Sequence, residues 1–147
     1  MPPAAAIQKL SPWTTIATNV ALTGTLAQIG VAFCVATFAN ATVDIRYTAN
    51  GGGGTGSPGI AIDLSRDPAT VDPTGITDWT PLLILGGATF ALGVITAYTE
   101  QVRPLAAAGV ATTFDTRWPD VIDVSCHFWL RVRMLDVDAA LPGTVTI

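Results

Sequence analysis

Charged residues are scarce in this sequence. Only 12% of the 147 residues are charged, about half the fraction usual in a globular domain. Lys9 is the one lysine, and the other basic residues are arginines. Water-facing surfaces normally favour lysine, whereas arginine enrichment is typical of protein interfaces. The composition therefore favours a surface that another protein or lipid covers over a free monomer.

Positive charge is too scarce for a nucleic-acid binder. The formal net charge is −4 and the sequence pI is about 4.5, so the long-range field repels a polyanion. The start, MPPAAAIQKL, has no basic segment followed by an apolar run, which predicts no secretory signal and a chain that stays where it is made. Nucleic acid is not an expected partner.

Residues that carry catalysis or bind metals are also few. His127 is the one histidine, and Cys34 and Cys126 lie in apolar stretches, where we expect small buried hydrophobic residues rather than a disulfide or reactive pair. No nucleophile elbow, phosphate loop or zinc motif occurs. The aspartates at 63, 67, 72 and 78 offer the oxygens that calcium prefers, but turn formation explains them better. We expect no enzyme activity, no cofactor and no metal site.

Two stretches, 10–43 and 79–99, contain no charged residue and are long enough to cross a bilayer as helices. The first is rich in Thr, Asn and Gln, which suits half-buried strands. The second is flanked by Asp78 and Glu100 and lacks the Lys/Arg bias that sets an orientation. A span at 79–99 is therefore only an alternative, and the sequence favours no membrane.

Short alternating runs separated by Gly and Pro turns predict β-strands. Residues 42–48 (TVDIRYT) and 59–65 (GIAIDLS) are expected to pair as a hairpin across a flexible Gly-rich loop at 51–59. Asp63 is expected to face outward, and the Asp-Pro pairs at 67–68 and 72–73 to begin turns of a structured loop. The side chains expected to face the core are Val43, Ile45, Tyr47, Ile60, Ile62 and Leu64.

These elements predict an all-β single-domain β-sandwich over 13–147, preceded by an extended, proline-bearing N-terminal arm at 1–12. A jelly roll is the first choice and an immunoglobulin-like sandwich the alternative. Residues 144–147 (TVTI) are expected to form a final edge strand.

Residues 123–135 (DVSCHFWLRVRML) alternate so strictly that they predict one strand with two unlike faces. The apolar face, expected to point to the core, comprises Val124, Cys126, Phe128, Leu130, Val132 and Met134. The other face comprises Ser125, His127, Trp129, Arg131 and Arg133.

Three interpretations of the second face remain open. In the first, another part of the chain, such as the N-terminal arm, covers Trp129. In the second, the face is a protein interface formed by Trp129, Arg131, Arg133 and His127, since Trp and Arg are enriched in hot spots. In the third, the face stacks nucleic-acid bases, which the acidic pI disfavours.

The Thr/Ala/Gly-rich strands, the PPAAA arm, the GGGGTGSPG loop, the near absence of lysine and the HFWLRVRM strand together resemble small accessory proteins of tailed-bacteriophage virions, in particular jelly-roll capsid decoration or cement proteins. The resemblance implies a non-enzymatic structural protein of the virion, assembled in the host cytoplasm. It also implies binding to the major capsid protein or another virion subunit, and self-association as a dimer or trimer.

Two alternatives stand beside this resemblance. The first is a carbohydrate-binding sandwich, which would use Trp79, Trp118 or Trp129 as sugar platforms. The second is a small membrane protein with a span at 79–99.

Overall fold

The structure, a computed structural model, describes residues 13–50, 58–82, 103–104, 113–117, 121–136 and 138–147; for 103–104 and 113–117 the description is of the backbone. Strands dominate this part of the chain, with one short 3-10 helix, η1 (Pro73–Gly75). All strand pairs within it are antiparallel. The described chain is therefore all-β, as the sequence predicts.

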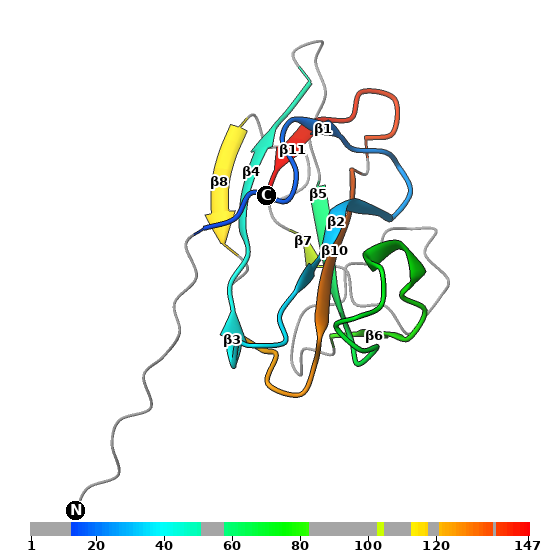
Figure 1. Cartoon of the computed structure of the whole chain (residues 1–147). Helices are drawn as coiled ribbons and strands as arrows, with labels where there is room; N and C mark the ends of the chain where they lie inside the picture. The colour runs from blue at the N-terminus through cyan, green and yellow to red at the C-terminus, as the bar shows by residue number, and fades with distance from the viewer. Residues whose placement is uncertain (1–12, 51–57, 83–102, 105–112, 118–120, 137) are drawn as a thin grey trace, which may run out of the picture.

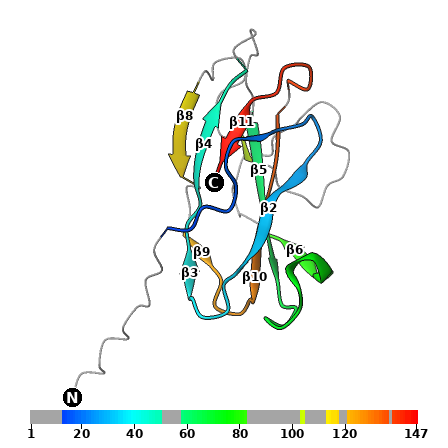
Figure 2. The ribbon, with the colours of Figure 1, turned by 45° about the horizontal axis from the view of Figure 1, so that its top comes forward.

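Two sheets face each other (Figures 1 and 2). The first, here called the β4 sheet, has the order β1 (Val20–Ala21), β11 (Thr144–Thr146), β4 (Asp44–Thr48), β8 (Thr113–Arg117). The second, the β10 sheet, has the order β2 (Ala27–Cys34), β10 (Trp129–Asp136), β5 (Pro58–Ser65), β6 (Trp79–Pro81), and β7 (Arg103–Pro104) also pairs with β5. A small ribbon joins β3 (Asn40–Ala41) to β9 (Ile122–Asp123).

The hydrophobic core lies between the two sheets. It takes Ile45, Tyr47 and Val145 from the β4 sheet and, among others, Ile62 and Val132 from the β10 sheet. Because successive strand residues point to opposite faces, the alternating runs fix which side chains enter the core. The predicted β-sandwich is confirmed, as are the inward positions of all six side chains expected from the two runs.

The predicted hairpin is wrong. Residues 44–48 form β4 of one sheet and residues 58–65 form β5 of the other, so the chain crosses between the layers instead of turning back. The intervening segment is longer than a tight turn, and nothing in it requires its flanking strands to be neighbours. Residues 58 and 59 of the predicted loop belong to β5; residues 51–57, and the predicted arm at 1–12, lie outside the described residues.

The last strand is also not an edge. β11 lies between β1 and β4, because residues 16–22 run along its other side. The amides of Ile16 and Ala17 donate to the Ile147 carbonyl at 2.7 and 3.2 Å, and the Ile147 amide donates back to the Ala17 carbonyl at 3.0 Å. The start of the described chain thus closes this side of the β4 sheet.

A buried polar contact ties the two sheets together. The Tyr47 hydroxyl of β4 donates to the Asp136 carboxylate at the end of β10 over 2.7 Å, and the Gly143 amide donates to the same carboxylate over 2.9 Å. Burial, together with this carboxylate, raises the pKa of Tyr47. A Cβ on Gly143 would lie 2.5 Å from the Tyr47 ring, so this position requires glycine. The contact fixes β10 relative to β4.

The strand predicted over 123–135 is broken. β9 ends at Asp123, a turn follows at 125–126, and β10 begins at Trp129. The Asp123 carboxylate accepts from the amide and hydroxyl of Ser125 at 2.9 and 2.6 Å, and the His127 amide donates to the Val124 carbonyl. A short side chain that caps the backbone two residues on competes with strand pairing in this way.

The broken strand changes which side chains reach the core. Val124, Leu130, Val132 and Met134 are buried there as expected, whereas Cys126 and Phe128 are exposed. The inward positions predicted for these two residues are therefore wrong, because the turn interrupts the alternation.

Candidate functional site

The predicted interface residues of β10 lie on the face of the β10 sheet that points away from the core. Antiparallel pairing sets Trp129 opposite Ser65 of β5, and Ser65 opposite Trp79 of β6. In the adjacent row, Arg131 lies opposite Asp63. Residues directly opposite on one face interact across strands. These side chains form a cluster, called here the outer-face cluster: Asp63, Trp79, Trp129, Arg131 and Arg133.

Asp63 holds both arginines of this cluster. Its carboxylate lies 2.5 Å from Nε of Arg131, and 2.8 Å and 2.7 Å from Nη2 and Nε of Arg133. The Asp63 side chain is only 1% exposed. A buried carboxylate is costly unless charges and hydrogen bonds compensate it, and two guanidinium groups do so here. Asp63 does point away from the core, as predicted, but it is buried.

The two tryptophans complete the cluster. The Arg131 guanidinium lies over the Trp79 ring, 4.4 Å from its centroid, which is within the range of a cation–π contact. Trp129 is only 6% exposed and packs with Ala32 and Ile76. Ser65 between the tryptophans is small, so both rings fit on one row of the sheet.

The loop at 66–78 covers Trp129 in this cluster. The Asp67 carboxylate accepts from the amides of Thr77 and Asp78 at 2.9 and 3.1 Å, which closes the loop on itself. Asp72 caps η1 through the Thr74 amide at 2.8 Å. Both aspartates form turns, as the sequence predicts. The indole Nε1 of Trp129 donates to the Pro68 carbonyl at 3.3 Å, so the loop and the strand are joined.

The structure therefore places three of the four predicted interface residues together and separates the fourth. Trp129, Arg131 and Arg133 share the outer face of β10, where Trp129 lies beneath the loop and the two arginines pair with Asp63. His127 lies in the turn that precedes the strand. Of the three interpretations of this face, the contacts of Trp129 match cover by the same chain, and its cover is the 66–78 loop. Trp129 leaves little surface for another molecule.

His127 lies near charged residues of neighbouring segments. Burial and the Arg66 guanidinium lower the pKa of its imidazole, and Asp123 acts in the opposite direction. Its Nδ1 is buried and has no hydrogen-bond partner among the described residues. A neutral imidazole is favoured in this position.

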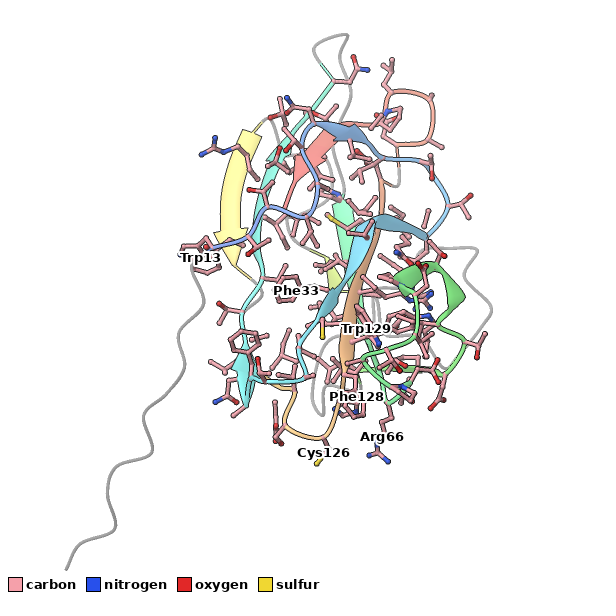
Figure 3. All side chains as sticks on the ribbon, in the orientation of Figure 1. Trp13, Phe33, Arg66, Cys126, Phe128 and Trp129 are labelled. Carbon is pink, nitrogen blue, oxygen red and sulfur yellow. The ribbon has the colours of Figure 1, made fainter. Side chains whose placement is uncertain are left out.

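A different apolar group reaches the surface, which the alternation did not predict. Phe128 is 38% exposed, and Figure 3 shows it at one end of the molecule with Cys126 and Arg66, here called the Phe128 end. The signal for it is Asp123-Val124-Ser125, because an aspartate two residues before a serine favours a capped turn.

Cys34 and Cys126 are free thiols, both exposed, which corrects their predicted burial. Nowhere in the described ranges do three or more His, Cys, Asp or Glu side chains come together as metal ligands do. No helix within those ranges is long and apolar enough to cross a membrane. Most of the alternative span at 79–99 lies outside them, and Trp79–Pro81 is strand β6.

Comparison with known proteins gives no relative for this chain. No protein-family model, no curated protein and no solved structure matches it.

Proposed function

We propose that this chain is a non-enzymatic structural protein of a virion, of the capsid decoration or cement kind, which binds and stabilises the major capsid shell. The observation that carries the proposal is the charge-poor surface of the sandwich, on which large apolar side chains remain open to solvent. These are Trp13, Val31, Val121 and Phe128. Apolar groups on a surface with few charges favour contact with another protein.

The contacts of the aspartate side chains support the same proposal. The Asp63 carboxylate forms ion pairs with two arginines, and the Asp136 carboxylate accepts hydrogen bonds from Tyr47 and Gly143. The carboxylates of Asp67 and Asp72 accept hydrogen bonds from backbone amides. Each of these carboxylates stabilises the fold. A decoration protein needs no catalysis, because many copies that each bury an interface stabilise a shell through the sum of their contacts.

The carbohydrate-binding alternative has less support. A sugar platform needs an open ring face. Trp129 is buried, the Trp79 ring carries the Arg131 guanidinium, and Trp118 lies outside the described residues.

The test is co-expression with the major capsid protein encoded in the same genome, followed by sedimentation of the assembled shells through a sucrose gradient. We expect the chain to sediment with the shells. We assign the contact to the Phe128 end, where an exposed aromatic ring offers a large apolar area. Phe128→Ser should therefore reduce the amount retained by about ten-fold, the effect of losing ~1.4 kcal/mol of contact.

Val121→Ser is the matched control, because it also removes an exposed apolar side chain, 65% open, from another segment. A chain that stays at the top of the gradient, or a genome with no capsid gene, would overturn the proposal. Equal loss for both variants would overturn the assignment of the Phe128 end as the contact.

A further inference from the structure

β2 forms one edge of the β10 sheet. It pairs with β10 on one side, and none of the strands that the structure describes pairs with its other side. In Figures 1 and 2 it is drawn in front of β10. The Val35 amide, just beyond β2, donates to the Phe128 carbonyl at 2.8 Å. Because amide directions alternate along a strand, the amides of Ala32 and Cys34 point to the open side.

The sequence of β2 differs from those of the outer strands β6, β7 and β8, whereas β1 and β3, two residues each, also lack charge and proline. Proteins usually protect an edge with a charge, a proline or a bulge. β6 ends in Pro81, β7 contains Pro104, and the sequence of β8 includes Asp115 and Arg117. β2 (AQIGVAFC) has neither charge nor proline and lies inside the uncharged stretch 10–43. Among the described edges β2 is the longest without a charge or a proline, and its one protective feature is the bulge at Gly30.

A bulge at Gly30 divides β2 into two halves. Gly30 has a φ of +66°, and the register against β10 shifts at this point. The Ile16 carbonyl lies 2.1 Å from where a Cβ on Gly30 would be, so the backbone at Ile16 packs closely against Gly30. In the second half, residues 31–34, Val31 is 62% exposed and Cys34 is exposed, whereas the Ala32 side chain is buried against Ile76 and Trp129.

We propose that residues 31–34 of β2 pair in antiparallel fashion with the same residues of a second copy, about a two-fold axis. Antiparallel pairing is two-fold symmetric, so one edge supplies both the donors and the acceptors. The net charge of −4 opposes association of two copies in general, but no like charges meet at this edge because β2 has none. The inference goes beyond the proposed function, since it concerns two copies of the chain and needs no shell.

The test is sedimentation velocity of the purified chain over a range of concentrations, with two variants. Val31→Lys places a charge at the open edge, and Val121→Lys adds the same charge at an equally exposed valine elsewhere. We expect the wild type and Val121→Lys to shift from monomer to dimer together as concentration rises. Val31→Lys should need about ten-fold higher concentration or more, because a lysine on an edge strand opposes pairing.

Three outcomes would overturn the proposal: a wild type that stays monomeric at every concentration, an assembly that Val31→Lys does not weaken, or an equal effect of Val121→Lys. If Val31→Lys does not fold, amide hydrogen exchange of the wild type decides the matter. The amides of Ala32 and Cys34 should exchange more slowly as concentration rises, and exchange that is independent of concentration would overturn the pairing.

Discussion

Replacing Trp129 by alanine is expected to lower the free energy of unfolding by about 3–5 kcal/mol, the usual cost of removing a large buried aromatic side chain. The side chain is 6% exposed, packs with Ala32 and Ile76, and donates to the Pro68 carbonyl. Its loss leaves a cavity and removes the hydrogen bond that joins β10 to the 66–78 loop. Chemical denaturation of the purified variant measures the change.

The matched control is the preceding residue. Phe128→Ala should cost about 1 kcal/mol or less, as substitutions at exposed positions do, because this ring is 38% exposed at one end of the molecule (Figure 3). Strict alternation over 123–135 predicts instead that Phe128→Ala lowers the free energy of unfolding more than Trp129→Ala does. If Phe128→Ala destabilises the chain more than Trp129→Ala, the loop does not cover the outer face in solution.

Replacing Asp63 by alanine is expected to cost about 3–5 kcal/mol, the range measured when one partner of a buried ion pair is removed. The change takes the carboxylate away from Arg131 and Arg133, whose side chains are largely buried. The free energy of unfolding from denaturant titration gives the size of the loss.

Asp63→Asn separates charge from packing in this cluster. The asparagine keeps the volume and one oxygen acceptor but not the negative charge. We therefore expect Asp63→Asn to lower the free energy of unfolding by nearly as much as Asp63→Ala does. A loss below about 1 kcal/mol for Asp63→Ala would mean that the arginines are hydrated, as in surface pairs. The Asp63 carboxylate would then be open to water in solution.

The sequence predicted the parts of the fold that depend on local pattern. Ile60, Ile62 and Leu64 enter the core because the pleat of β5 sends alternate residues to one face. Asp67 and Asp72 cap turns because their side chains reach amides of the same loop. These outcomes follow from geometry within a few residues, which the sequence displays directly.

The failures concern contacts between segments far apart in the chain. Nothing near β4 or β5 encodes that they belong to different sheets, and nothing near Trp129 shows that the 66–78 loop covers it. The same holds for Asp63, whose burial depends on arginines that lie 68 and 70 residues away. The exposure of Phe128 is different, because the Asp123–Ser125 turn was visible locally and the strong alternation masked it.

The most direct measurement is an electron cryomicroscopy reconstruction of capsid shells assembled together with this chain. The account predicts additional density on the shell, at symmetry-related positions, into which the two-layer sandwich fits with the Phe128 end towards the capsid protein. Shells that carry no such density, although the chain is folded and present in excess, would contradict it.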